Sequence, residues 1–140
     1  MAETIQVDIV SAEGAIFSGP ARMVFVPASQ GELGILPRHA PLLTLLKPGE
    51  VRVQPAEGDE QPFYVGGGAL EVQPHRVTVL ADTALRAKDI DEAAAQAAKQ
   101  RAEETLRSKV DKIGQAEALA ELARAVALLK VVQRLRKLRG

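Results

Sequence analysis

The sequence predicts an α+β protein in which an N-terminal antiparallel β-sandwich or barrel is followed by a C-terminal antiparallel two-helix hairpin. All eight prolines lie at or before Pro74, and all four aromatic residues lie at or before Tyr64. After residue 88 there is no proline, and glycine occurs only at positions 114 and 140. This is a change from a composition typical of strands and turns to one typical of helices. We therefore divide the chain into a β domain, residues 1–88, and a helical domain, residues 89–140.

The β domain is expected to contain many short strands. Ile5, Val7 and Ile9 alternate with polar residues, which is the pattern of a half-buried strand. Turn signals such as Glu13-Gly14 separate the later apolar runs, and regular short spacing favours an antiparallel sandwich or barrel. The expected strands include residues 23–26, 42–46, 51–53, 63–65, 70–73 and 77–80, with turns at 13–14, 18–20, 48–49, 57–59 and 73–75.

Residues 29–49 form the most distinctive stretch of the β domain. It holds three glycines and three prolines, and it ends in the apolar run 42–46. Such a composition predicts a shaped loop that leads into a buried strand. Its few polar residues are suited to contact with another protein, although an elaborate connection without a partner explains the pattern equally well. These polar residues are Gln30, Glu32, Arg38 and His39.

The three consecutive glycines at 66–68 are interpreted as a bulge or a close approach of two backbones. A phosphate-binding loop is disfavoured because no Lys-Ser/Thr pair follows and the next segment resembles a strand.

The helical domain is expected to hold two helices joined at Gly114. The segment Asp89-Ile90-Asp91-Glu92 offers an N-cap carboxylate with a glutamate three residues later. One apolar stripe is predicted on each helix, and the first is mostly alanine, which gives a docking surface of modest strength. We therefore expect a hairpin that can open. The stripes are residues 90, 94, 98, 102, 106 and 110 on the first helix and 119, 122, 126, 129 and 133 on the second.

Composition excludes several functional classes. The β domain carries a formal charge near −3 and the helical domain near +3, which is far less basic than nucleic-acid binding requires. There is no cysteine, no apolar run long enough to cross a bilayer, and no signal-peptide pattern, so we expect a cytosolic protein. The two histidines, His39 and His75, lie in different turns, and no metal-ligand spacing or activated nucleophile is evident. We expect no catalytic residue and no metal.

The C-terminal end of the second helix is basic. Its five cations exceed what complementing a helix dipole requires, which favours an acidic partner surface. Anionic lipid is a third interpretation, because the helix is amphipathic as well. The cations are Lys130, Arg134, Arg136, Lys137 and Arg139.

Four stretches give the chain a close resemblance to the epsilon subunit of bacterial F-type ATP synthase. They are VDIVSAEGAIFSG, GELGILPRHAPLLT, LKPG and GGALEVQPHRVTVLADTA, and an alanine-rich hairpin opening with DIDEA follows them. The resemblance covers nearly the whole chain. It implies a sandwich of about ten strands that binds the gamma subunit and rests on the ring of c subunits.

The resemblance also implies a function. The chain would be a non-catalytic rotor component of the central stalk, on the cytoplasmic face of the bacterial plasma membrane, that couples proton-driven rotation to ATP synthesis. Glu32 and His39 match loop positions that face the ring and gamma. The hairpin would lie against the sandwich or extend into the alpha/beta head, where it blocks ATP hydrolysis. Lys130, Arg134 and Arg136 are the candidates for contact with acidic beta-subunit segments.

The chain departs from the resembled family at one site. Some members bind ATP through an Ile/Leu-Asp-x-x-Arg-Ala motif and two arginines one turn apart on the second helix. Here Asp91 and Arg124 remain, but Ala94 and Leu128 stand where the other arginines would be. We expect weak ATP binding or none, because two of three guanidinium groups are missing.

Two other functions stay open from the sequence. A free-standing ATP-sensing regulator would bind ATP tightly as an isolated chain. A basic peripheral membrane module would bind anionic vesicles in a salt-sensitive way.

Overall fold

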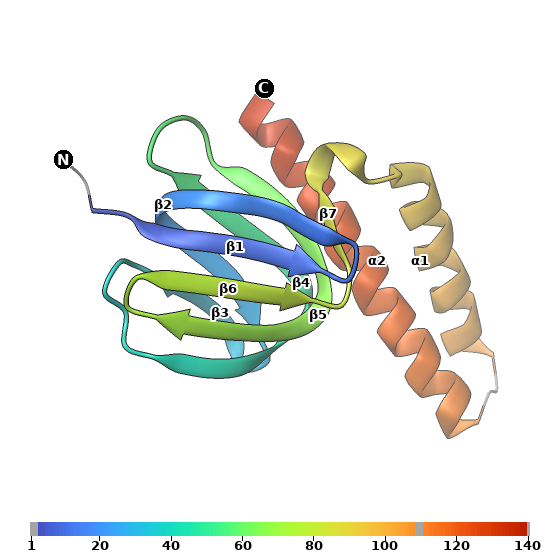
Figure 1. Cartoon of the computed structure of the whole chain (residues 1–140). Coiled ribbons are helices and arrows are strands. Elements are labelled where there is room, and N and C mark those ends of the chain that lie inside the picture. Colours follow the sequence, from blue (N-terminus) through green and yellow to red (C-terminus); the bar gives the residue numbers. More distant parts are fainter. Residues whose placement is uncertain (1–2, 109–110, 140) are drawn as a thin grey trace.

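A computed structural model describes residues 3–108 and 111–139 of the chain. Seven strands form one closed, strongly bent sheet, and two helices lie along one side of it (Figure 1). The elements are β1 (Ile5–Ser11), β2 (Gly14–Ala28), β3 (Gly31–Ile35), β4 (Leu42–Pro55), β5 (Gln61–Gln73), β6 (Arg76–Ala81), β7 (Ala84–Arg86), the 3-10 helix η1 (Ala87–Asp89), α1 (Glu92–Arg107) and α2 (Lys112–Arg139).

The sheet closes because its first strand pairs with two others. The order is β1-β6-β5-β4-β2-β3, with β7 against β5, and β1 also pairs with β2. All pairs are antiparallel except β1–β6, which is parallel. These two strands lie near opposite ends of the β domain in the sequence. Every strand contributes apolar side chains to one core, as the alternation of Ile5, Val7 and Ile9 predicts. The predicted β body followed by a helical hairpin is confirmed.

The strands are fewer and longer than the sequence predicts. Three of them exceed twelve residues, and β2 and β5 change partner along their length, so each serves as more than one short strand. The turns predicted at 18–20 and 48–49 are wrong, because both segments lie inside ladders. In β4, Pro48 faces Gly66 and Gly49 faces Val65, so cross-strand pairing overrides the local turn preference.

At Gly68 the backbone of β6 leaves no room for a side chain on β5. Its φ is +136°, and a Cβ placed there would lie 2.1 Å from the carbonyl oxygen of Leu80. The close backbone approach predicted for the glycine triplet is therefore found.

The helical hairpin differs from the prediction in the residue that caps α1, in the position of the break between the helices, and in the residues that are buried. Asp91, rather than Asp89, caps α1, and its carboxylate accepts from the Ala94 amide at 3.0 Å. The break between the helices precedes Gly114, which lies inside the first turn of α2 and donates its amide to Asp111. Val110, the last member of the predicted stripe on the first helix, lies outside the described residues.

The contact line predicted for α2 is partly wrong. Leu119 and Val126 are exposed, while small residues are buried instead. This helix contacts two surfaces, α1 and the sandwich, so a single stripe cannot describe it. Its buried residues are Ala118, Ala125, Ala127, Leu129, Val131 and Val132.

Replacement of Gly68 by alanine should lower the free energy of unfolding by about 3 kcal/mol, from backbone strain and displacement of β6 together. Gly58→Ala is the matched control, because Gly58 also has a positive φ but nothing lies within 4 Å of its added Cβ. It should cost only about 1–2 kcal/mol. Urea unfolding followed by circular dichroism measures both, and equal losses would contradict the close approach.

Candidate functional site

A buried carboxylate on β4 fastens the hairpin to the sandwich. The side chain of Glu50 is 2% exposed, and Arg134 of α2 meets both of its oxygens. The Nε of Arg134 lies 3.2 Å from each oxygen and its Nη2 lies 3.1 Å from Oε1. A carboxylate without a partner is costly to bury, and a guanidinium binding both of its oxygens is among the strongest partners a protein supplies. This pair therefore fixes where α2 docks.

Arg52, two residues along β4, connects Glu50 to two further carboxylates. Its Nη2 donates to Glu32 on β3 at 3.0 Å, and its Nη1 lies 3.9 Å from Glu60. Its guanidinium carbon lies 4.2 Å from the centre of the Phe25 ring, which holds it by a cation–π contact. We call these five charged residues the charge cluster: Glu32, Glu50, Glu60, Arg52 and Arg134.

One atom of the charge cluster is left without a hydrogen bond. The Nε of Arg52 is buried and, among the described residues, has no hydrogen-bond partner. It lies 3.5 Å from Oε1 of Glu50, within ion-pair distance but beyond a good hydrogen bond. Arg52 and Arg134 therefore flank the same carboxylate.

The charge cluster stabilises the charged form of Arg134. Its hydrogen bonds to Glu50 raise the pKa of Arg134, against the opposing effect of partial burial, and the charges of Glu50, Glu60 and Glu32 raise it further. The three carboxylates thus act together on the cation that α2 brings to them.

The other basic residues predicted to bind a partner have different surroundings. Arg136 forms an exposed ion pair with Glu92, which joins the two helices, and Lys130 is exposed. In this docked arrangement Arg134 is occupied by the sandwich, so its contact with an acidic partner stays a prediction for another arrangement of the hairpin.

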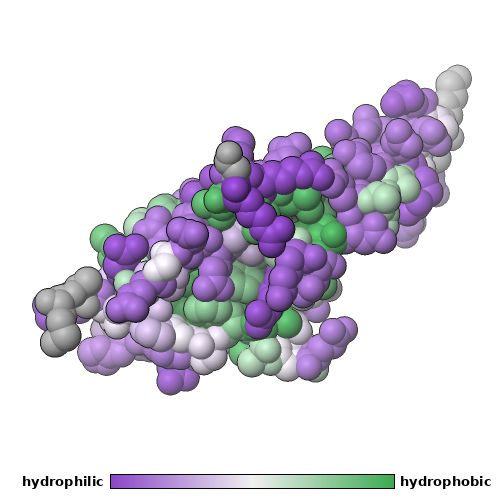
Figure 2. Space-filling model, turned by 90° about the horizontal axis from the view of Figure 1, so that it is seen from above, coloured by the Kyte–Doolittle hydropathy of each residue, from purple (hydrophilic) through white to green (hydrophobic). Residues whose placement is uncertain are grey.

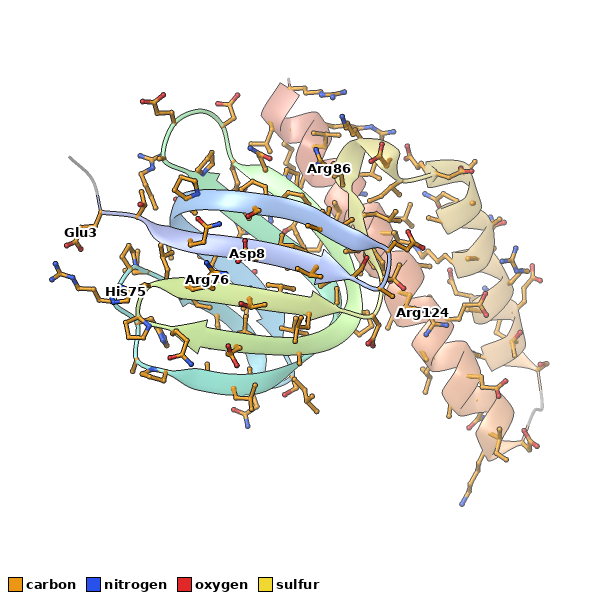
Figure 3. The ribbon with its side chains drawn as sticks, viewed as in Figure 1. Glu3, Asp8, His75, Arg76, Arg86 and Arg124 are labelled. Atoms are coloured by element: carbon orange, nitrogen blue, oxygen red, sulfur yellow. The ribbon has the colours of Figure 1, made fainter. Side chains whose placement is uncertain are left out.

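Glu32 and His39 do not lie together. Glu32 contacts Arg52, whereas the loop of His39 is held by Arg38, whose amide donates to the Pro74 carbonyl and whose side chain pairs with Glu3. Figure 3 shows Glu3 and His75 at the end of the sandwich remote from α2. The two predicted contact residues therefore have different neighbours in the structure.

The sequence interpretation missed an exposed apolar surface. Leu43, Leu45 and Leu80 are 76%, 66% and 51% exposed, although the run 42–46 is predicted to be buried. Alternation within the strand turns half of this run outward, because Leu46 on the other face is buried. A hollow of about 650 Å³ adjoins it, lined by Leu45, Pro48, the glycine triplet and Leu80. A protein partner of apolar surface suits such a face.

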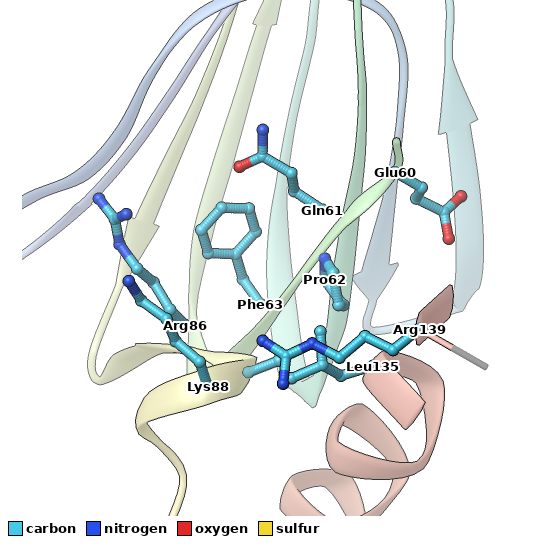
Figure 4. A pocket seen from close by; sticks show the side chains of 9 residues that line it. Glu60, Gln61, Pro62, Phe63, Arg86, Lys88, Leu135 and Arg139 are labelled. Atoms are coloured by element: carbon cyan, nitrogen blue, oxygen red, sulfur yellow. The ribbon is translucent and has the colours of Figure 1, made fainter. Parts of the chain in front are cut away.

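A second hollow, of about 250 Å³, opens where the end of α2 meets the sandwich. Arg86, Lys88 and Arg139 line it together with Phe63 and Leu135, and Figure 4 shows the Glu60 carboxylate directed away from the three cations. From above, Figure 2 shows hydrophobic residues gathered in this central region, whereas the projecting end of the hairpin is mostly hydrophilic.

Neither a metal site nor a membrane-spanning helix is found in the part of the chain that the structure describes. No three acidic or histidine side chains are grouped to hold an ion. No described helix combines the length and the apolar character needed to cross a membrane.

Comparison with known proteins places the chain in a family. The family model for the ATP synthase Delta/Epsilon chain beta-sandwich domain matches residues 4–87, and the model for its long alpha-helix domain matches residues 88–133. The chain belongs to the ATP synthase delta/epsilon family. This confirms the resemblance drawn from the sequence; the domain boundary at residue 88 stays a prediction.

Relatives in this family match the whole chain. An ATP synthase epsilon chain from Nitrosococcus oceani is 66% identical over 140 residues and covers 100% of both chains. One from Halorhodospira halophila is 60% identical over 136 residues and covers 96% of each.

Solved structures share the fold. A chain in the Euglena gracilis mitochondrial ATP synthase, OSCP/F1/c-ring, superposes with a TM-score of 0.82 at 20% identity, covering 91% of this chain and 80% of that one. A chain in the Tetrahymena thermophila mitochondrial ATP synthase central stalk/c-ring gives 0.66 at 14% identity, covering 93% and 97%.

Within this delta/epsilon chain, the residues left from a nucleotide motif have structural surroundings of their own. Asp91 is occupied as the N-cap of α1, and Ala94 is exposed. Leu128 packs in the small apolar cluster between α2 and the sandwich. Burial raises the pKa of Tyr64 in that cluster, while the charge of Arg124 acts to lower it. Of the three positions where the resembled motif has arginine, Arg124 is the one that holds it in this sequence, and weak or absent ATP binding stays a prediction.

Arg134→Ala should weaken docking of the hairpin by about 2–4 kcal/mol, somewhat less than for a fully buried pair because Arg134 is partly exposed. The control is Arg136→Ala, whose exposed pair should contribute less than about 1 kcal/mol. Thermolysin cleavage of the helical domain under native conditions measures the difference. Equal cleavage rates in the two variants would show that Glu50 does not fasten α2.

Proposed function

We propose that this chain is the epsilon subunit of a bacterial F-type ATP synthase, a non-catalytic part of the rotor's central stalk. It would couple rotation of the c ring to ATP synthesis, and its hairpin would restrain ATP hydrolysis. Full-length relatives named ATP synthase epsilon chain support this assignment. The observation that carries it in the structure is the division into a sandwich with its own core and a hairpin attached to it by a small apolar cluster and the Arg134–Glu50 ion pair.

The two-part organisation supports a body that stays bound and an arm that moves. The sandwich core draws on all seven strands and contains no helix residue. The cluster that joins the hairpin to the sandwich is small, with Ala127 and Val131 as its buried members from α2. So small an apolar contact allows docked and extended states to differ by a few kcal/mol, which a partner can overcome.

Separate surfaces of the sandwich suit separate partners. The exposed leucines 43, 45 and 80 offer gamma an apolar face, and Glu32 and His39 offer polar contacts to the ring or gamma. After release from Glu50, Arg134 could join Lys130 and Arg136 on an acidic segment of the beta subunits. The chain would thereby be held peripherally at the cytoplasmic face of the plasma membrane, through the complex.

Truncation after Lys88 tests the assignment. The sandwich should still assemble with gamma and the ring, because its core needs no helix residue. ATP hydrolysis by the assembled enzyme should rise several-fold because the restraining arm is gone. Co-purification and a coupled ATPase assay measure the two effects.

Glu50→Gln in the full chain is the matched counterpart to truncation. This substitution removes the charge that holds Arg134 to the sandwich, but the chain keeps its hairpin and the cations on it. The extended, inhibiting arrangement should become more populated, so ATP hydrolysis should fall. A truncated chain that assembles without raising hydrolysis would remove the inhibitory role, and one that fails to assemble while folded would remove the stalk role.

The isolated chain should bind ATP weakly or not at all. Ala94 and Leu128 leave a single arginine, Arg124, for the phosphates, and Asp91 is occupied as a helix cap. Isothermal titration with ATP should show no saturation below millimolar concentration. The variant carrying both Ala94→Arg and Leu128→Arg should bind more tightly, and saturation of the unaltered chain at micromolar ATP would favour a nucleotide-sensing role.

A further inference from the structure

We propose that Glu32 binds a cationic side chain of a partner protein and that this contact, relayed through Arg52 and Glu50, releases Arg134 and with it the hairpin. The inference deepens the proposed function, because it assigns the partner contact at Glu32 an effect on the hairpin. It rests on the distances, burial and charges of the charge cluster.

The first step is that Glu32 can be reached from outside. Its side chain is 50% exposed, in contrast to the 2% of Glu50. Among the described residues, its carboxylate accepts one hydrogen bond, from Arg52 at 3.0 Å, which uses one of its two oxygens. A carboxylate offers about four acceptor sites, so an incoming lysine or arginine finds acceptors available.

The second step is that Arg52 is positioned to exchange partners. It donates to Glu32 through Nη2. Its buried Nε has no hydrogen-bond partner among the described residues and lies 3.5 Å from Oε1 of Glu50. A shift of several tenths of an ångström would bring this pair to the length of a charge-assisted hydrogen bond. The Phe25 ring lies under the guanidinium, 4.2 Å from its central carbon, and contributes a cation–π contact that does not depend on which carboxylate Arg52 binds.

The third step is that Glu50 has two competing cations. With the hairpin docked, Arg134 takes both oxygens of Glu50. When the hairpin leaves, Glu50 loses Arg134, and Arg52, whose Nε already lies 3.5 Å from Oε1, is placed to take over as its cation. A partner cation on Glu32 compensates that carboxylate and repels Arg52 toward Glu50. It therefore favours the state in which Arg134 is no longer required.

The sign of the effect has independent support. The charge of Glu32 attracts Arg134 and raises its pKa, along with those of Glu50 and Glu60. Neutralising Glu32 weakens this attraction as well, so direct and relayed effects act in the same direction. By linkage, release of the hairpin should in turn make Glu32 a better acceptor for the partner.

The experiment uses the isolated full chain, in which a lysine at position 32 stands in for the partner's cation. Native-state hydrogen exchange of α2 amides reports hairpin opening, and the amides of β6 serve as an internal reference for the sandwich. Glu32→Gln should raise the opening constant about fivefold, and Glu32→Lys more than that, in the range usual for coupled sites. Unchanged opening in both variants would overturn the proposal.

Matched controls separate local effects from general charge. Glu71→Gln and Glu71→Lys make the same changes at an exposed glutamate on β5 and should alter opening less than twofold. If the Glu71 variants open the hairpin as much as the Glu32 variants, net charge explains the result and the relay fails.

A double-variant cycle tests the route through Arg52. In an Arg52→Gln background, Glu32→Gln should change opening less than twofold; a persistent fivefold effect would show direct attraction and overturn the relay. Arg52→Lys gives a second background if the first loosens the β6 amides, because lysine cannot bridge two carboxylates as arginine does. All these variants are judged without the complex, so their outcome is independent of whether the chain assembles in a stalk.

Discussion

The docked arrangement of this protein depends on a carboxylate buried in a β-strand. Glu50 lies on β4 beneath α2, where an apolar residue would pack with less desolvation cost. Because the carboxylate is buried, it requires a cation. Arg134 binds it through two nitrogens, Nε and Nη2, and this two-point contact also sets the position of the helix along the sheet. A hydrophobic pair could hold α2 as firmly, but it would fix its position less strictly and could not be released by exchanging one charge for another.

The apolar contacts divide the molecule into two parts of unequal strength. The sandwich core contains many large buried side chains, such as Phe63, Ile9 and Leu70, whereas α2 contributes the small buried residues Ala127 and Val131 to a cluster in which Tyr64 is the large member. Buried area scales with side-chain size, so the first cluster stabilises its unit far more than the second stabilises docking. The ion pair therefore matters most where apolar burial is smallest.

Much of the fold could be predicted from the sequence, but the charge cluster could not. Alternation at Ile5, Val7 and Ile9 identified a core strand because periodicity is a local property. Glu50, next to buried Val51, has the alternating pattern of a surface position, and its partner lies 84 residues away. The turn predicted at Pro48-Gly49 is wrong for a related reason. The turn preference of these residues is a local property, whereas their pairing with β5 depends on residues distant in the sequence. The α2 contact line was missed because the helix meets two neighbours.

The uneven charge of the two halves acquires a structural meaning in this arrangement. The acidic sandwich and the basic hairpin attract one another, and the Arg134–Glu50 pair turns that general attraction into a defined contact. The exposed cations at the end of α2 are screened by salt, whereas the buried pair is screened much less. A hairpin that leaves the sandwich carries the same cations to whatever acidic surface it meets. Of these cations Arg134 is the one that Glu50 holds in the docked arrangement, so it would become available to an acidic partner only when the hairpin leaves.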